Sequence, residues 1–243
     1  GNWYTHPAFT LGNSELKGIW VGKFETTGNT ATPTIKPGIT SLREMLVPNM
    51  YSVGKLFRST NYITAEGVNH ADSHMMKNIE WGAVAYLKQS IYGLGITDIE
   101  TNYMSGYYTG GGTGTSYKTN IGQSTSGNIT GVYDMSGGAY EYVMGNYNKT
   151  AGSSGLTVSG VPVEHIDIYL GTSVAASHLG DATGETAGWY GDYTFFVDAS
   201  NTWFTRGGYS FMNLAQTGIF NFVPSNGESR NDSGFRTVLS VTE

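Results

Sequence analysis

The sequence predicts a single α+β domain spanning residues 1–243, and three observations support this prediction. Only 13% of the residues are charged, whereas 35 are glycine and 17 are tyrosine. This composition is typical of a loop-rich protein with β-strands, because Gly, Asn and Ser favour turns and aromatic residues fit a pleated sheet. One segment has apolar residues at helical spacing, and such a helix needs a sheet to cover. The chain shows no internal repeat and no clear linker.

Charge and composition exclude several classes of protein. The 13 basic and 19 acidic residues give a net charge of −6 without any basic run, so we expect no nucleic-acid partner. The chain has no cysteine, which excludes disulfides and a thiol nucleophile. No stretch is apolar enough to cross a bilayer, and no signal peptide is present. Because the sequence opens abruptly at Gly1, we expect that a targeting or anchoring segment is missing from it.

The N-terminal third predicts short strands and one short helix. Residues 18–27 alternate in polarity with a period of two, which indicates a strand that pairs with residues 7–11 through a turn at 12–14. Residues 31–38 contain two prolines and are expected to form a loop. Residues 40–46 are typical of a short helix that ends before Pro48.

The clearest predicted helix begins near residue 72 and ends near Tyr92. Asp72 or Ser73 would cap its N-terminus, and Gly93 and Gly95 would stop it. The apolar stripe on which this prediction depends consists of Met76, Ile79, Ala83, Val84 and Leu87.

The rest of the chain divides into loops and short strands. Residues 105–127 lack the apolar side chains for a core of their own, so we expect a long surface loop. Residues 131–145 place aromatic and apolar residues around a small turn at 136–139, which we interpret as a hinge within the core. Further strands are expected within 161–170, 193–197, 203–204 and 237–241.

Two groups of residues have the chemistry of metal or catalytic sites. His70 and His74 have helical i, i+4 spacing with Asp72 between them, but helix capping explains these residues better. Asp181, Glu185 and Asp192 could form a calcium loop or a glycosidase carboxylate pair, although solvated acids are the simpler interpretation in a Gly-rich turn. His165 and His178 have no identifiable nucleophile partner. The sequence contains no nucleophile elbow, phosphate loop or dinucleotide fingerprint.

Four segments, in order, resemble the formylglycine-generating-enzyme (sulfatase-modifying-factor) superfamily, a branch of the C-type lectin fold. The resemblance implies an α+β, C-type lectin-like domain with small antiparallel sheets, two helices and long Gly-rich loops. The segments that carry it are Gly18-Ile-Trp-Val-Gly-Lys-Phe-Glu-Thr-Thr27, Glu80-Trp-Gly-Ala-Val-Ala-Tyr-Leu87, Tyr133-Asp-Met-Ser-Gly-Gly-Ala-Tyr-Glu-Tyr142, and Arg206-Gly-Gly-Tyr-Ser210 with Gly234-Phe-Arg236.

Departures from the family pattern limit what can be carried over. The oxidising enzymes need a cysteine pair, so this chain cannot generate formylglycine, and we expect no catalytic residues. Gly138 stands where the family has an asparagine, while Glu141 remains. A structural calcium ion near this turn is the only cofactor that the resemblance implies, and losing one oxygen ligand weakens that expectation. No protein residue is assigned as a metal ligand.

The chain is most similar in character to ligand-binding members of the superfamily, including variable proteins of diversity-generating retroelements and pilin-anchored surface proteins of gut Firmicutes. That resemblance implies an extracellular protein on a bacterial cell surface or a phage particle, with an unknown protein or glycan as ligand. The ligand-facing segment would be 203–236, with Trp203 and Phe204 in the core and Arg206 structural beneath the face. Rigid aromatic and adaptable polar side chains suit such a face. The predicted ligand-binding residues are Tyr209, Phe211, Asn213, Phe220, Asn221, Phe222, Ser225, Asn226, Ser229, Asn231 and Asp232.

Two alternatives stay open at this point. The chain could be a structural pilus or virion subunit whose C-terminal face is buried on assembly. It could also be a cysteine-less enzyme of the same superfamily, such as a metal-dependent oxygenase, which would need a cluster of histidines and carboxylates. The oligomeric state cannot be read from the sequence.

Overall fold

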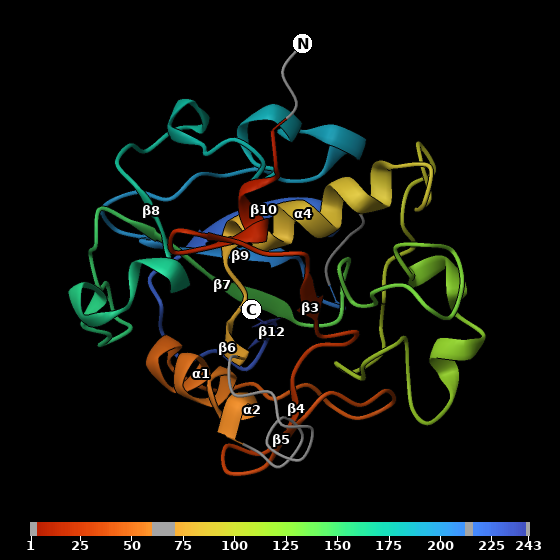
Figure 1. The fold of residues 1–243 in the computed structure, drawn as a ribbon. Helices are drawn as coiled ribbons and strands as arrows, with labels where there is room; N and C mark the ends of the chain where they lie inside the picture. Colours follow the sequence, from red (N-terminus) through yellow and green to blue (C-terminus); the bar gives the residue numbers. More distant parts are fainter. Residues whose placement is uncertain (1–3, 60–70, 212–215, 242–243) are drawn as a thin grey trace.

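The computed structural model describes residues 4–59, 71–211 and 216–241, and it has mixed α and β structure with small sheets (Figure 1). The helices are α1 (Val47–Gly54), α2 (Leu56–Ser59) and α4 (Asn78–Gln89). The strands are β1 (Thr10–Leu11), β2 (Ser14–Glu15), β3 (Ile19–Val21), β4 (Thr27–Gly28), β5 (Pro33–Thr34), β6 (Ala71–Met75), β7 (Tyr140–Tyr147), β8 (Asp167–Tyr169), β9 (Trp203–Gly207), β10 (Gly218–Ser225), β11 (Ser233–Phe235) and β12 (Thr237–Val241).

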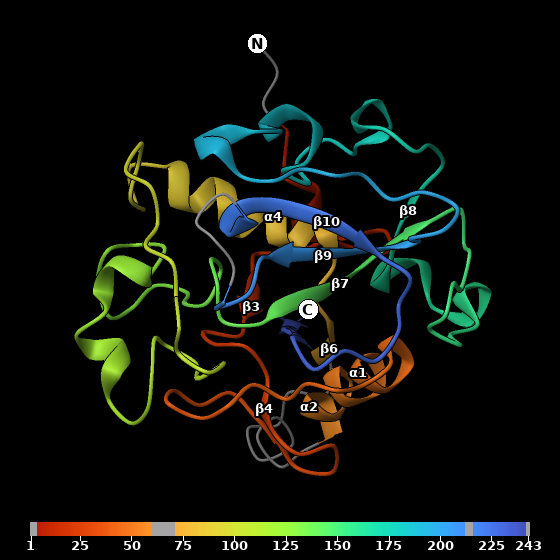
Figure 2. The same ribbon diagram turned by 180° about the vertical axis from the view of Figure 1, so that it is seen from behind.

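The central sheet has the strand order β10-β9-β7-β11, and β8 also pairs with β7. Pairings β7–β9 and β9–β10 are antiparallel, whereas β11 and β8 run parallel to β7. A second sheet has the order β3-β12-β6, and β1–β2 and β4–β5 form two small hairpins. Helix α4 crosses the central sheet, while α1 and α2 lie beside β6 (Figures 1 and 2). The α+β class and the small antiparallel sheets are therefore confirmed.

The core lies between α4 and the central sheet. Trp81 of α4 is fully buried, and its Nε1 donates a hydrogen bond of 2.7 Å to the carbonyl oxygen of Ile219 on β10. Phe204 and Phe222 pack edge to face in the same cluster. A second buried cluster joins α1 to the other end of the sheet and includes Trp203. Burial of these large side chains fixes α4 on the sheet.

The helix predicted from residue 72 begins later than expected. Residues 71–75 form β6, which pairs with β12, and the helix spans only Asn78–Gln89. Glu80 caps it, because Glu80 Oε2 accepts a hydrogen bond of 2.8 Å from the backbone N–H of Lys77. Asp72 and Ser73 are therefore strand residues and not caps. The strand that pairs with these residues, β12, lies about 165 residues further along the chain. The spacing of apolar residues within the predicted helix cannot indicate so distant a pairing.

Two other N-terminal predictions are wrong. Residues 40–46 are not helical; α1 starts at Val47, with Pro48 in its first turn, where proline is favoured because the missing N–H needs no partner. The strand at 19–21 does not pair with residues 7–11. Instead β1 pairs with β2, and β3 pairs with β12. As an edge strand β3 leaves Trp20 72% exposed.

The loop predicted for residues 31–38 is interrupted by β5 at Pro33–Thr34, which pairs with β4, whereas the loop predicted for residues 105–127 is present. Residues 105–127 contain no named strand or α-helix, only two 3₁₀ turns at 116–118 and 121–123. Within 161–170 the strand is limited to β8. Residues 193–197 form no named strand, although Thr194 makes an isolated bridge to Phe222. Across the described residues, no helix has the length and apolar character needed to span a bilayer.

Candidate ligand-binding face

The turn before β7 is held by four buried ionisable residues, which we call the ionic frame: Glu25, Asp134, Glu141 and Arg236. Arg236 donates from Nε to Glu141 Oε2 at 3.0 Å, and its other nitrogens bond the carbonyl oxygens of Gly22 and Tyr133. Because Gly22, Tyr133 and Glu141 of β7 all bond to this one side chain, Arg236 ties distant parts of the chain together.

The carboxylates of the ionic frame outnumber its arginine. Burial, followed by the charges of Asp134 and Glu141, raises the pKa of Glu25 well above its usual range. Burial also raises the pKa of Asp134 and of Glu141, although Arg236 opposes both shifts. Glu25 accepts hydrogen bonds from the Ser41 hydroxyl and from the backbone N–H of Ala139. Protein donors thus occupy these oxygens.

Gly138 is required by this arrangement. Its φ is +75°, and a Cβ there would lie 2.5 Å from Glu25 Oε1. Larger side chains, including the asparagine of the family pattern, would therefore displace Glu25. The donors around Glu25 and Asp134 leave few oxygens for a calcium ion, which takes six to eight. The residues present do not fit a structural calcium ion.

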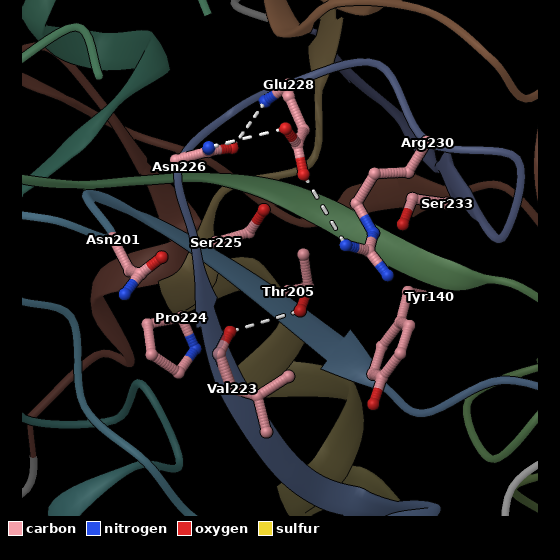
Figure 3. A pocket seen from close by; sticks show the side chains of 10 residues that line it. All are labelled: Tyr140, Asn201, Thr205, Val223, Pro224, Ser225, Asn226, Glu228, Arg230 and Ser233. Atoms are coloured by element: carbon pink, nitrogen blue, oxygen red, sulfur yellow. Dashed lines mark hydrogen bonds and ion pairs between the residues drawn. The ribbon is translucent and has the colours of Figure 1, made fainter. Parts of the chain in front are cut away.

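A polar pocket of about 190 Å³ lies over the central sheet, between the strands and the β10–β11 connection (Figure 3). Glu228 and Arg230 reach from that connection toward one another, with 3.6 Å between their charged atoms. Arg230 also forms two hydrogen bonds to Asp232, of 2.9 and 2.7 Å. The pocket is lined by Tyr140, Asn201, Thr205, Val223, Pro224, Ser225, Asn226, Glu228, Arg230 and Ser233.

Four aromatic side chains adjoin this pocket through Tyr140, and we call them the aromatic group: Tyr107, Tyr140, Tyr209 and Phe211. Tyr209 lies 5.4 Å from Tyr140 and 6.3 Å from Tyr107, measured between ring centroids. Phe211 meets Tyr107 edge to face at 5.5 Å and is 47% exposed. The Arg43 guanidinium lies 4.1 Å from the Tyr107 ring centroid, a cation–π contact. The polar pocket and the aromatic group together form the candidate ligand-binding face.

Several predicted ligand-binding residues belong to this face. Tyr209 and Phe211 are in the aromatic group, and Ser225 and Asn226 line the polar pocket. Ser229 and Asn231 are exposed on the β10–β11 connection. Asp232 is buried, so it acts by orienting Arg230 and not through an exposed carboxylate. Asn213 lies outside the described residues.

The prediction is wrong for three residues of β10. Phe220, Asn221 and Phe222 are fully buried and belong to the core. Trp189 and Tyr190 pack on Phe220, and Phe196 and Phe204 pack on Phe222. The loop before β9 therefore covers β10 on the side that was expected to face a ligand. The alternation of Phe and Asn in the sequence does not reveal that another loop packs over these residues.

Residues outside the predicted set also shape the face. Tyr140 follows the turn of the ionic frame, and Tyr107 lies within residues 105–127, which are expected from the sequence only to form a surface loop. Asn201, Glu228 and Arg230 complete the pocket. The Arg230–Asp232 spacing of two residues was the available signal, since a carboxylate so close can orient a guanidinium.

The structural residues beneath the face were predicted correctly. Trp203 and Phe204 are fully buried. Arg206 is buried too, and it donates to Asn78 Oδ1 at 2.8 Å and to the carbonyl oxygen of Ala182 at 2.9 Å. Burial lowers the pKa of Arg206 to about 10, which still leaves the guanidinium charged at neutral pH.

The acidic loop forms neither a calcium loop nor a catalytic carboxylate pair. Asp181 is buried and accepts hydrogen bonds from the Tyr169 hydroxyl and the Thr183 hydroxyl. Asp192 is also buried and accepts from the backbone N–H of Phe220 at 3.0 Å. Only Glu185 is exposed, so the expectation of solvated acids is wrong for the two aspartates. His74 lies on strand β6 and not in a helix, so helical i, i+4 spacing does not apply to it. His70 lies outside the described residues.

Searches with the sequence against models of known families and against curated proteins found no match.

Proposed function

We propose that this protein is a non-enzymatic ligand-binding protein with a C-type lectin-like domain, displayed outside the cell on a bacterial surface or on a phage particle. One observation carries the proposal: a polar pocket and a partly exposed aromatic group lie side by side on a frame that is buried and charged. The ligand would be a protein or a glycan on a cell surface.

The chemistry of the face supports binding better than catalysis. Aromatic rings provide rigid contact area at small entropic cost, and Asn and Ser provide adaptable hydrogen bonds. Asn226 and Ser225 offer both donors and acceptors at the pocket, and Arg230 adds an oriented charge. The described residues that line the pocket include no histidine and no pair of a nucleophile and a base. Shape and hydrogen-bond complementarity would therefore carry the affinity, with aromatic anchors contributing most.

The proposal is tested by ligand capture with single variants. Labelled protein is applied to a glycan array and to a displayed library of surface proteins, and the ligand found is then titrated. Tyr209→Ala and Phe211→Ala should each weaken binding by about tenfold or more, as expected for aromatic anchors. Phe195→Ala is the matched control, because Phe195 is 57% exposed but lies outside the aromatic group.

Unchanged affinity of both variants in a folded protein would refute this face as the binding surface. Solution mass gives a second check. A stable oligomer that hides Phe211 from chemical labelling would favour the structural-subunit alternative.

We also propose that the protein is a variable protein of a diversity-generating retroelement. The genomic test is a near-copy of the codons for 203–236 that differs at adenines and lies near a reverse transcriptase. Since Phe220 and Phe222 are core residues, the differing codons should cluster at exposed positions such as Phe211, Ser229 and Asn231. A repeat differing mainly at core codons would contradict the proposal.

A further inference from the structure

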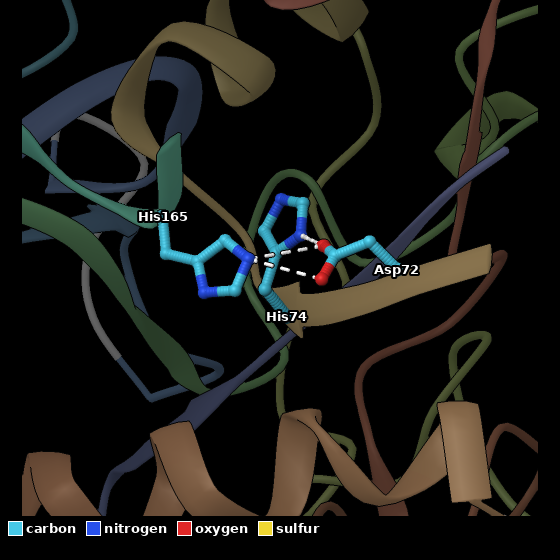
Figure 4. A group of neighbouring side chains, drawn as sticks. All are labelled: Asp72, His74 and His165. Carbon is cyan, nitrogen blue, oxygen red and sulfur yellow. Dashed lines mark hydrogen bonds and ion pairs between the residues drawn. The ribbon is translucent and has the colours of Figure 1, made fainter. Parts of the chain in front are cut away.

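Three side chains converge beside β6, away from the candidate ligand-binding face. Asp72 and His74 come from β6, and His165 comes from the 3₁₀ turn Val163–His165 (Figure 4). His74 Nδ1 lies 2.6 Å from Asp72 Oδ2, and His165 Nε2 lies 3.1 Å from both carboxylate oxygens of Asp72. One nitrogen of each imidazole and the Asp72 carboxylate all lie within 4.8 Å of one another.

The outward nitrogen of each histidine also has a partner. His74 Nε2 is 2.8 Å from Glu80 Oε1, and His165 Nδ1 is 2.8 Å from the Tyr51 hydroxyl. Metal-binding histidines in proteins have this arrangement, because an acceptor on the far nitrogen fixes the ring and its tautomer. Both imidazoles are therefore held with one nitrogen directed at the same carboxylate.

Two carboxylates face His74, because Asp72 Oδ2 lies 2.6 Å from its Nδ1 and Glu80 Oε1 lies 2.8 Å from its Nε2. A divalent ion bound to His74 Nδ1 would lie beside both carboxylates and compensate their negative charge.

The donor set selects the class of metal. Two imidazoles and one carboxylate suit zinc and neighbouring transition ions, whereas calcium and magnesium prefer oxygen donors only. Donors around a tetrahedral zinc ion are about 3.4 Å apart, so the 2.6 and 3.1 Å contacts to Asp72 would lengthen by less than 1 Å, while the wider separations, within 4.8 Å, would shorten about the ion. His74 is fully buried, while the side chains of Asp72 and His165 are 17% and 11% exposed, which leaves a route from solvent.

We propose that Asp72, His74 and His165 bind one divalent transition-metal ion, best matched by zinc, with Glu80 and Tyr51 positioning the two imidazoles. Three protein ligands leave a coordination position for water. The ion would fasten β6 and α1 to the segment that leads into β8. This site is separate from the proposed ligand-binding function and does not depend on it.

The test is a titration of the metal-free protein with Zn²⁺ against a chromophoric chelator. We expect one equivalent bound per chain. His165→Gln should lower the affinity at least about 100-fold, and Glu80→Gln, which touches no metal, should lower it about 10- to 100-fold. His178→Gln is the matched control, since His178 stacks on Tyr169 outside the cluster. Circular dichroism confirms that each variant is folded.

A second measurement does not depend on any variant. Co²⁺ added to the wild-type protein should give the strong visible absorption of a four-coordinate ion, and one equivalent of Zn²⁺ should abolish it. Substoichiometric Zn²⁺ binding, or equal affinity in His165→Gln and His178→Gln, would overturn the proposal and leave the cluster as a buried ion pair. Weak six-coordinate Co²⁺ absorption would overturn it as well.

Discussion

Two arginine–carboxylate pairs, whose arginines lie six residues apart in the chain, have opposite surroundings. Arg236 and Glu141, in the ionic frame, are both completely buried. Arg230 and Asp232, at the polar pocket, have side chains that are 41% and 11% exposed. The buried pair must satisfy every polar atom within the protein, whereas the pocket pair can exchange protein contacts for water or a ligand. The difference separates a pair that determines the fold from one available for recognition.

The largest effect should come from removing the arginine of the ionic frame. Arg236→Ala leaves Glu141 buried without a cation, which should lower the free energy of unfolding by about 3–5 kcal/mol. Urea unfolding followed by circular dichroism measures the loss. Arg236→Lys keeps the charge but loses the two parallel hydrogen bonds that Nε and Nη2 of Arg236 donate to the Glu141 carboxylate, so its stability should fall between wild type and Arg236→Ala. A loss below about 1 kcal/mol for Arg236→Ala would remove the contrast between the pairs.

The next effect should come from the glycine that faces Glu25. Gly138→Ala places a Cβ 2.5 Å from Glu25 Oε1 at a φ of +75°, and should cost about 2–4 kcal/mol. Gly155→Ala is a matched control, because Gly155 has a φ of +72° and open space around its Cβ position. Gly155→Ala should lower the free energy of unfolding only by the cost of placing a side chain at positive φ, about 1–2 kcal/mol. Equal losses would show that the contact with Glu25 contributes nothing.

The ionic frame should also make stability depend on pH. The pKa of Glu25 is raised well above the ordinary value of 4.5 in the folded protein, so the folded state holds a proton that the unfolded state releases above pH 4.5. The contribution of Glu25 to stability is therefore highest below that pH and falls as pH rises, by up to about 1.4 kcal/mol per pH unit. Glu25→Gln removes this contribution, so its unfolding free energy should fall less steeply between pH 5 and 8. If the unfolding free energies of wild type and Glu25→Gln depended on pH in the same way, the raised pKa of Glu25 would be contradicted.

These contrasts also explain how far the sequence could predict the structure. The turn at 136–139 was predictable, because it contains two adjacent glycines. The structural role of Arg206 was predictable as well, because the residues next to it in the sequence indicate it. The extent of α4 was not, because β12 pairs with residues 71–75 and overrides their helical spacing. Long-range pairing of this kind leaves no local pattern.

The candidate sites show the same division. Tyr209 and Phe211 were predictable from composition, but the burial of Phe220 depends on Trp189 and Tyr190, which cover it from a separate loop. His165 lies 93 residues from Asp72 in sequence, and only the fold brings them together. Residue type therefore predicts the chemistry of a side chain, whereas the packing of distant segments decides whether that side chain is exposed.

The smallest effect on stability should come from the pocket pair. Arg230→Ala removes an ion pair that water can replace, so the free energy of unfolding should change by about 1 kcal/mol or less, and less still at high salt. Affinity for the captured ligand should fall by about tenfold or more, because Arg230 lines the pocket with its guanidinium oriented by Asp232. Titration of ligand and urea unfolding on the same preparation measure both quantities. A variant that loses several kcal/mol of stability, yet keeps full affinity, would mean that Arg230 belongs with Arg236 as part of the structural support and that the recognition surface lies elsewhere.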